Sequence, residues 1–591
     1  MLSGGRFVVL CALMAGGILA VGRSSALPVA LLASEVFATI LGLFLFGSFK
    51  YQIHKNALTY GMLLVIVATF CGLATSTWHV EISERGWAFW MNTHLLSFSG
   101  LDDLIHVDTM LFILGLTLFV AVIAQTRLLE GLTFFLLRRN QGAIVPTVIS
   151  VTAVVAVASG ALGGVSMIGL TIRTLVIILM RGGAPIAALR YAVMVCTAIT
   201  TICGVWTAYG EPPNLIMKAN LYPSLTNGFF LFYGAPVAIT SYLVVAWHLR
   251  KKLGGPRVDL DDMDVIEANA EDVRFLQAAR HGEVMTPVEL IEGHAADLGD
   301  LTEPVMERLR NGESLGLAMI RADVPEVTRR TLLAHYVSEE LADGLDLHYV
   351  YDAAGEYELA MSAEQAVDEV LRAMAKRRRR AQKTGAFALV PFFGMLIVHA
   401  VYNHVPLFLA SFAAFFAALP GIAKIRKTRE LALREAYQEY REYYFLFPLF
   451  LSITLLTSSG FFSVMQHLVV LGIATLGQAH VAVAQFLGST FLSAILDNNI
   501  VADFASRALY GLDVRVLHFF AMAQIAGYAL GGCWTHIGCA QSVVAYAFIQ
   551  RDVDEHYTPV QWIREMTPVV VQTLAALTAL IYLERVLLSW W

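Results

Sequence analysis

Long apolar runs recur along most of the chain and predict a bundle of membrane-spanning helices. A helix needs about 20 residues to cross a bilayer, and most of the runs come close to that length. The ten-residue alternation of a membrane β-barrel does not occur in the sequence. The pattern therefore predicts an all-α polytopic membrane protein. The expected spans lie near residues 7–22, 27–48, 57–77, 109–125, 187–206, 227–248, 385–401, 404–423 and 568–588.

A long polar section interrupts the apolar runs. Basic clusters stand at its two ends, at 250–252 and 376–380, and positive charge beside a span marks the cytoplasmic side. We expect residues 251–383 to form a cytoplasmic insertion. Two short runs inside it, Leu315–Arg321 and Leu347–Tyr351, resemble strands, so a small α/β domain is predicted. Regulation and simple spacing both stay open as its role.

A shorter polar stretch, 424–442, mixes charges of both signs at helical spacing and predicts a solvated amphipathic helix. A long apolar segment, 443–476, follows it. Of the 591 residues 57% are hydrophobic and 15% charged, and the mean hydropathy is +0.63. The six cysteines form no Cys-x-x-Cys pair, so neither a disulfide framework nor a zinc site is expected. The first apolar run lacks a small-residue cleavage site and predicts a retained helix.

Two apolar stretches contain residues that break helices. The run 143–178 carries four glycines and Arg173 as its only charge, which predicts either a re-entrant hairpin or two spans packed closely through small residues. The run 489–510 carries Asp497, Asn498 and Asn499 in a row. Short polar side chains of this kind tolerate non-helical backbone, so a broken helix is predicted there, with a surface loop as the alternative.

The two breaker stretches belong to an internal repeat. Each is followed by a charged helix and then by a Trp-Thr-x-x-Gly motif, at Trp206–Gly210 and Trp534–Gly538. Transporters built from two structural repeats hold their solute where interrupted helices of both halves meet. We therefore divide the chain into extra N-terminal helices (1–99), a first transporter repeat (100–250), the insertion (251–383) and a second repeat (384–591). The matching pairs are Ser159 and Ser493, Leu162 and Leu496, Arg173 and Arg507, Trp206 and Trp534, Thr207 and Thr535, and Gly210 and Gly538.

The candidate site is defined by two carboxylates in apolar surroundings, Asp497 and Glu211. A charge at the centre of a bilayer costs about 2.5 kcal/mol or more, so such residues face a bundle interior or a wet cavity. Asp497 and Asn498 offer the oxygen ligands that a hard cation such as Na⁺ prefers. His536 changes charge near physiological pH and is either a proton carrier or a core residue. The remaining candidates are Asn499, Ser493, Thr535, Ser542, Asn214, Thr207 and Ser159.

These motifs resemble the ion transporter superfamily, which includes NhaD-type sodium/proton antiporters, arsenite permeases, and citrate and dicarboxylate carriers. Leu496–Asn498 is similar to the Asp-Asn hairpin motif of the antiporters, Thr535–Gly538 to their Thr-Pro-Ile-Gly, and Glu211–Asn214 to the Thr-Pro-Pro-Asn of related permeases. The resemblance implies two inverted repeats with re-entrant hairpins and broken helices. Gly163-Gly164 replaces a second Asp-Asn, and the Ser-Asn-Thr tips of dicarboxylate carriers are absent.

The leading functional hypothesis is a cation/proton antiporter of a bacterial inner membrane, with Na⁺ or H⁺ as coupling ion and no cofactor. One alternative is a Na⁺- or H⁺-coupled anion carrier of the citrate, dicarboxylate or arsenite type. Another is a membrane sensor that signals through the insertion. No residue spacing indicates an enzyme. The expected partners are a small ion or anion and membrane lipid, without nucleic acid; a homodimer is compatible with the sequence.

Overall fold

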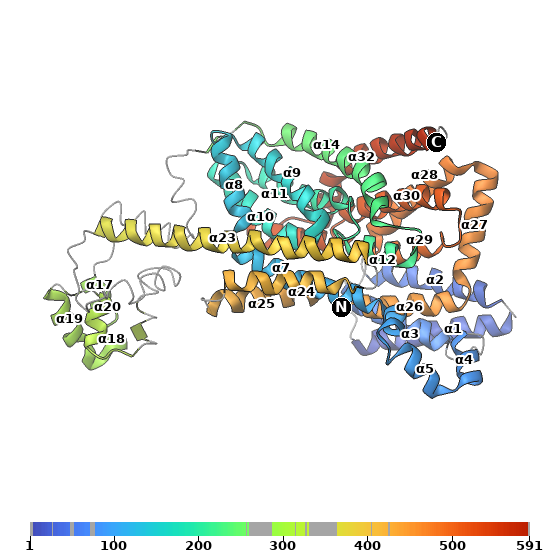
Figure 1. The fold of residues 1–591 in the computed structure, drawn as a ribbon, viewed down its shortest axis with the longest axis horizontal. Coiled ribbons are helices and arrows are strands. Elements are labelled where there is room, and N and C mark those ends of the chain that lie inside the picture. Colours follow the sequence, from blue (N-terminus) through green and yellow to red (C-terminus); the bar gives the residue numbers. More distant parts are fainter. Residues whose placement is uncertain are drawn as a thin grey trace. The chain divides into compact units, whose positions relative to one another are not determined.

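The computed structural model places the chain in two compact units, residues Met1–Val258 with Thr384–Trp591, and residues Asp259–Lys383. Figure 1 shows the helices of both. Each unit is described by itself. The residues that the structure describes are 4–25, 28–47, 53–70, 77–255, 257–258, 287–311, 313, 315–325, 328–329, 332, 363–402, 405–422, 426–441 and 443–588.

The described part of the smaller unit is helical, and the predicted strand at Leu315–Arg321 is wrong. These residues form α20, because Leu, Ala and Met favour helices and place Leu315, Ala318 and Met319 on one face at helical spacing. That face packs on α19. The run Leu347–Tyr351 lies outside the described residues. The elements are α17 (Pro287–Gly293), α18 (Ala295–Leu298), the 3-10 turn η4 (Gly299–Leu301), α19 (Thr302–Arg310) and α20 (Leu315–Arg321).

The larger unit begins with a group of helices that precede the first repeat. The helices α1 and α3 pack on each other, α3 packs on α26, and α2 packs on α27 of the second repeat. Phe37 of α2 stacks on Phe504, with ring centroids 3.9 Å apart, so this group is joined to the transporter core. The helices are α1 (Gly4–Ser24), α2 (Val29–Leu45), α3 (Lys55–Phe70), α4 (Thr77–Arg85), α5 (Trp87–His94) and α6 (Phe98–Ile105).

The first repeat contains the predicted re-entrant hairpin. The helices α9 and α10 meet at Gly163, whose φ of +80° is readily adopted only by glycine. A broken helix follows, in which α11 and α12 are separated by irregular backbone. The elements are α7 (Val107–Gln125), α8 (Leu128–Arg139), α9 (Ile144–Leu162), α10 (Gly164–Arg181), α11 (Ile186–Thr200), the 3-10 turn η2 (Ile202–Gly204), α12 (Pro212–Asn220), α13 (Asn227–Phe229), the π-turn η3 (Phe230–Gly234) and α14 (Ala235–Lys252).

The second repeat contains the same sequence of parts. A hairpin of α28 and α29 breaks at Leu496 and Asp497, and a broken helix of α30 and α31 is interrupted after Trp534. A π-turn and a long last helix then follow, as in the first repeat. The elements from the insertion onward are α23 (Ala363–Val401), α24 (Phe408–Ala418), the 3-10 turn η6 (Leu419–Gly421), α25 (Arg426–Arg441), α26 (Leu446–Ser458), α27 (Phe461–Leu476), α28 (Gln478–Ile495), α29 (Asn498–Arg507), α30 (Val514–Trp534), α31 (Ala540–Phe548), the π-turn η7 (Ile549–Val553) and α32 (Pro559–Leu588).

Equivalent helices of the two repeats run in opposite directions. The start of α11 lies against the start of α32, where Arg190 contacts Glu565 with an N–O distance of 2.6 Å. The start of α30 lies instead beside α13, which leads through η3 into α14: His518 donates to the Ser224 carbonyl at 2.9 Å and packs on Phe229. The C-terminal end of α14 and the N-terminal end of its counterpart α32 line one cavity. The repeats are therefore inverted, as the resemblance implies.

By length and composition, eight of the described helices can cross a membrane, or nine if a pair bent by 73°, Arg429–Ser458 and Phe461–Leu476, counts as one span. The protein is thus an integral membrane protein. The bend divides the apolar segment 443–476, which the sequence presents as continuous. It occurs at Gly460, which adopts a left-handed conformation with φ of +79° and begins α27.

The helix α25 lies within the stretch 424–442, for which an amphipathic helix is predicted, and Arg429, Glu430, Arg434 and Arg441 are on its exposed side. It packs on α7, and its acidic side faces the protein: Glu435 contacts Arg173 of α10 at 3.3 Å. Leu431 and Leu433 point outward and are 42% and 54% exposed. The helix therefore exposes charged and apolar side chains together, buries Ala432 and Ala436, and directs Glu435 toward the protein.

Candidate functional site

The two repeats build the same joint between hairpin and broken helix. In the first repeat, the Gly164 N–H at the hairpin tip donates to the Gly210 carbonyl at 3.1 Å. In the second, the Asn498 N–H donates to the Gly538 carbonyl at the same distance. The threonine hydroxyls form a second matching pair, with Thr207 donating to the Gly160 carbonyl and Thr535 to the Ala494 carbonyl. These are the repeat-related positions found in the sequence.

Glu211 is held at the centre of this joint by the opposite repeat. Pro212 and Pro213 open α12 and have no N–H groups, so the Glu211 side chain forms no capping bond at its own helix. Instead Gln541 of α31 donates to both of its carboxylate oxygens, at 2.8 and 2.9 Å. Glu211 is 2% exposed. In the described part of the chain, no Arg, Lys or His forms an ion pair with it.

Asp497 marks the break of the second hairpin and is 5% exposed. Its carboxylate caps α29 by accepting from the Asn499 N–H at 3.0 Å, and it also accepts from the Asn499 side-chain amide at 2.5 Å. The other polar atom of that amide, Asn499 Oδ1, is buried and has no hydrogen-bond partner among the described residues. A buried acceptor of this kind costs free energy unless a donor or a cation reaches it.

A further polar pair joins the broken helices of the two repeats. The Tyr528 hydroxyl of α30 donates to Asn214 Oδ1 at 2.5 Å, while the Asn214 amide donates to the Thr207 carbonyl at 2.8 Å. Both side chains are buried. Asn214 is therefore fixed from two sides, and the start of α12 is connected to the second repeat.

The two carboxylates lie within electrostatic range of each other, and Tyr443 lies within range of both. Four helices, α10, α12, α29 and α31, also begin at the two joints. The N-terminus of a helix carries partial positive charge, which favours carboxylates and bound anions. The arrangement can bind a cation or proton at its oxygens, and the helix ends around it can receive an anion.

Comparison with known proteins places this geometry in a family. The model of the citrate transporter family, CitMHS, matches residues 57–514. The chain belongs to this family. The citrate transporter family consists of membrane transporters, and the resemblance to the ion transporter superfamily is thereby confirmed. Among solved structures, the YdaH transporter of Alcanivorax borkumensis aligns with a TM-score of 0.41 and 14% identity, covering 89% of this chain and 97% of that chain. No curated protein matches the chain.

In this citrate transporter family member, several predicted site residues form the scaffold of the joints. Their hydroxyls donate to backbone carbonyls and so help to hold the breaks in the helices; all of these residues are buried except Thr207, which is half-buried. Thr207 and Thr535 do so at the joints. Ser159 donates to Ala156, Ser493 to Tyr528 and Ser542 to Gly532, at 3.0, 2.7 and 3.0 Å. Glu211, Asn214, Asp497, Asn498 and Asn499 are left as buried groups with oxygens at the gap between the repeats.

His536 stands apart from the carboxylates in its contacts. Its ring packs on Tyr546, with centroids 4.8 Å apart. It shares no described hydrogen bond with Glu211 or Asp497, and its Nδ1 is buried without a partner among the described residues. The residue itself is half-buried, and both interpretations of His536 stay open.

Sequence reasoning missed three residues that contact the site. Gln541 and Tyr528 bond Glu211 and Asn214, and Glu439 of α25 accepts from the Ser166 hydroxyl of α10 at 2.5 Å. Glu439 also lies within electrostatic range of Tyr443. Gln541 carried no signal in the sequence, because the corresponding position of the first repeat is Pro213, which has no polar side chain. Glu439 carried no signal, because its helix resembles a solvated one.

Proposed function

We propose that the chain is a cation/proton antiporter in which Glu211 and Asp497 bind either a cation such as Na⁺ or protons. The observation that carries this proposal is the pair of buried carboxylates, one from each repeat, that lie within electrostatic range of each other. An ionised carboxylate in a dry interior is costly unless its charge is balanced. A proton or a cation balances it, and because both use the same oxygens, the binding of one releases the other.

Neighbouring groups support a cation at this place. Hard cations prefer carboxylate and amide oxygens. Asn499 Oδ1 is a buried acceptor without a described partner beside the Asp497 carboxylate. Asn498 and Asn214 are also buried, and their amide oxygens accept from Asn499 and Tyr528. Exchange then requires the hairpins to move so that the site opens to one side of the membrane at a time.

A carrier of a carboxylate anion is the second candidate. It is favoured by the match to the citrate transporter family and by the four helix N-termini at the joints. In this candidate a cation or proton first neutralises Glu211 and Asp497, and the anion then binds at the helix ends. In both candidates the same two carboxylates would couple the flow of the transported solute to that of a second ion. The candidates therefore differ in the solute and not in the coupling site.

The orientation follows from charge. Arg139, Arg250, Lys251 and Lys252 gather at one end of the larger unit, which we call the basic end; there residues 143 and 257 form a β-bridge. Positive charge favours the cytoplasmic side. We propose that this end and the insertion face the cytoplasm of a bacterial inner membrane. A cysteine in place of Arg139 should react with an impermeant maleimide only after cells are opened; reaction in intact cells would reverse the orientation.

A liposome assay tests the function. Purified protein is reconstituted with an acidic lumen and a pH-sensitive dye, and Na⁺, Li⁺ or K⁺ is added outside. We expect at least one cation to alkalinise the lumen. Asp497→Asn and Glu211→Gln should reduce the rate to that of empty liposomes. Asp513→Asn is the matched control, because Asp513 also caps a helix, by accepting from the Arg515 N–H, but is exposed.

The outcomes separate the candidates. If none of the cations changes the lumenal pH, while labelled citrate accumulates only when Na⁺ or a proton gradient is present, the anion carrier replaces the antiporter. If Asp497→Asn and Glu211→Gln both transport as the Asp513→Asn control does, the two carboxylates are not the coupling site, and both candidates fail because both depend on them.

A further inference from the structure

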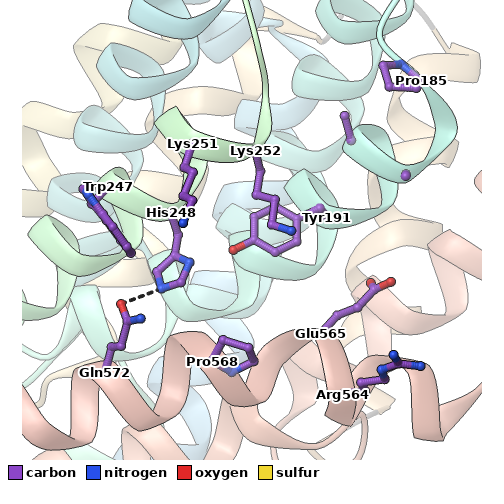
Figure 2. A pocket seen from close by; sticks show the side chains of 12 residues that line it. Pro185, Tyr191, Trp247, His248, Lys251, Lys252, Arg564, Glu565, Pro568 and Gln572 are labelled. Carbon is purple, nitrogen blue, oxygen red and sulfur yellow. Dashed lines mark hydrogen bonds between the residues drawn. The ribbon is translucent and has the colours of Figure 1, made fainter.

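A cavity of about 530 Å³ opens between α11, α14 and α32 at the basic end. Figure 2 shows its side chains. It shares no lining residue with the candidate transport site. It lies where the last helices of the two repeats meet, so a molecule bound there would contact both repeats.

The cavity is positively charged. Lys251, Lys252 and Arg564 line it, and none of the three forms an ion pair among the described residues. The acid in the lining, Glu565, is already engaged, because it contacts Arg190 at 2.6 Å and accepts from the Tyr557 hydroxyl at 3.0 Å. Three cations therefore remain for an anionic ligand.

Aromatic and apolar groups complete the wall. Lys251 Nζ lies 5.3 Å from the centre of the Trp247 ring, and Lys252 Nζ lies 5.8 Å from that of Tyr191. His248 contacts Gln572 at 2.9 Å, which joins α14 to α32 across the cavity (Figure 2). Trp247 is 51% exposed at the end of a predicted span, the depth at which tryptophans meet lipid headgroups.

We propose that this cavity binds an anionic phospholipid. Its phosphate would be held by Lys251, Lys252 and Arg564, and its apolar part would contact Trp247 and Pro568. Basic pockets between spanning helices on the cytoplasmic side favour such headgroups, and anionic lipids are enriched in that leaflet. A membrane lipid is favoured over a soluble anion because a large exposed tryptophan shares the wall with the cations. The lipid would stabilise the contact between α14 and α32.

Native mass spectrometry of the full chain tests the site. The protein is released from micelles that contain equal amounts of phosphatidylglycerol and phosphatidylcholine. We expect retained phosphatidylglycerol in the wild type and about tenfold or greater loss of it in K251Q/K252Q, since two of the three basic side chains that attract the anionic headgroup are removed. The double variant R139Q/R250Q is the matched control, because both arginines are exposed at the same end but neither lines the cavity.

Two further measurements test whether a lipid occupies the cavity. Brominated phosphatidylglycerol, but not brominated phosphatidylcholine, should quench the tryptophan fluorescence of the wild type. In W247F most of this difference in quenching between the two lipids should disappear. The fluorescence measurement does not depend on the folding of K251Q/K252Q. Inorganic phosphate at millimolar concentration should not displace the lipid. Equal retention in both double variants, equal quenching by both lipids, or displacement by phosphate would each overturn the proposal. The inference does not rest on the transport mechanism.

Discussion

At the scale of single residues, Gly164 explains why the first hairpin differs from the Asp-Asn pattern of the antiporters. A Cβ at this position would overlap Glu211 Oε1 and lie 2.5 Å from Gln541 Nε2. A side chain there would therefore occupy the space that the Glu211 carboxylate fills. The acid of the first repeat comes from the broken helix, whereas that of the second comes from the hairpin tip.

Gly164→Ala should disable transport without unfolding the protein. Because the new methyl group must displace the carboxylate or Gln541, we expect the transport rate to fall at least about tenfold, the equivalent of about 1.4 kcal/mol. The measurement is the liposome assay together with size-exclusion chromatography. Gly169→Ala in the same helix is the control, since no atom lies within 4 Å of its added Cβ. Equal loss in both variants would point to a general effect on α10.

Gln541→Leu tests the contact between the repeats. Leucine has a similar size but no N–H, so both bonds to Glu211 disappear, and a buried acceptor left unsatisfied costs about 1–3 kcal/mol. We expect weaker apparent affinity for the transported cation, measured as the concentration that gives half-maximal flux. Gln550→Leu, at an exposed glutamine in the same half, should keep the wild-type value. An unchanged value in Gln541→Leu would exclude a role for this contact in binding.

The sequence identifies the ionisable residues of the site better than the neutral ones. Asp497 and Glu211 stand out because a charge in apolar surroundings costs free energy. A charged residue kept at such a place therefore indicates a function. Gln541 and Tyr528 are ordinary members of apolar helices, and only the fold shows that they reach across to the other repeat. His536 stood out for its residue type, and its ring packs on Tyr546.

At the scale of secondary-structure elements, the two joints are near copies, and each depends on one threonine. Thr535→Val removes the 2.6 Å bond to the Ala494 carbonyl, and Thr207→Val removes its counterpart at Gly160. Loss of one such bond costs about 1 kcal/mol, and more where the carbonyl is left unpaired. We expect both variants to unfold at lower temperature and to transport more slowly.

A matched substitution isolates this effect. Thr475→Val removes a hydroxyl that bonds only carbonyls of its own helix, at an exposed position of α27. Its thermal midpoint in detergent should stay within the error of the wild type. A larger loss in Thr475→Val than in either joint variant would contradict the role assigned to the joints.

Elements were predicted correctly where the residue pattern fits only one backbone conformation or one environment. They were not predicted where the same pattern fits two. The hairpin breaks follow from Gly163 and Asp497, because backbone chemistry alone requires them. The helix α25 exposes several of its charges, as its pattern predicts, but Glu435 and Glu439 contact Arg173 and Ser166 of α10, which the pattern does not reveal. Leu315–Arg321 is a short apolar run, and helix and strand cannot be distinguished by periodicity at that length.

At the scale of the whole molecule, repeated motifs predict two halves but do not fix their relative direction. The inversion became apparent from end-to-end contacts, such as Arg190 with Glu565 at the starts of α11 and α32. Arg190 and Glu565 are 375 positions apart, and His518 and Ser224, at the other end, are 294 apart, so no local pattern reveals these contacts. The same contacts bring the ends of α14 and α32 together and form the basic cavity.

Every candidate site residue lies in the larger unit, whereas the described helices of the insertion have an apolar core of their own, which includes Ile291 and Met319. The transport function should therefore survive removal of the insertion. We predict that replacing residues 259–362 with a flexible Gly/Ser linker of about 30 residues leaves cation flux in liposomes within about threefold of the wild type, because a linker of that kind imposes little strain on its ends.

A second substitution makes this prediction decisive. Asp497→Asn in the shortened protein should abolish the remaining flux, which would show that the same site is at work. If the shortened protein inserts and elutes as a single species but transports nothing, the insertion is required for the transport cycle. If instead the wild type transports nothing and the insertion changes its protease sensitivity when a solute is added, the membrane unit acts as a sensor. The flux assay and limited proteolysis on the same preparations distinguish these cases.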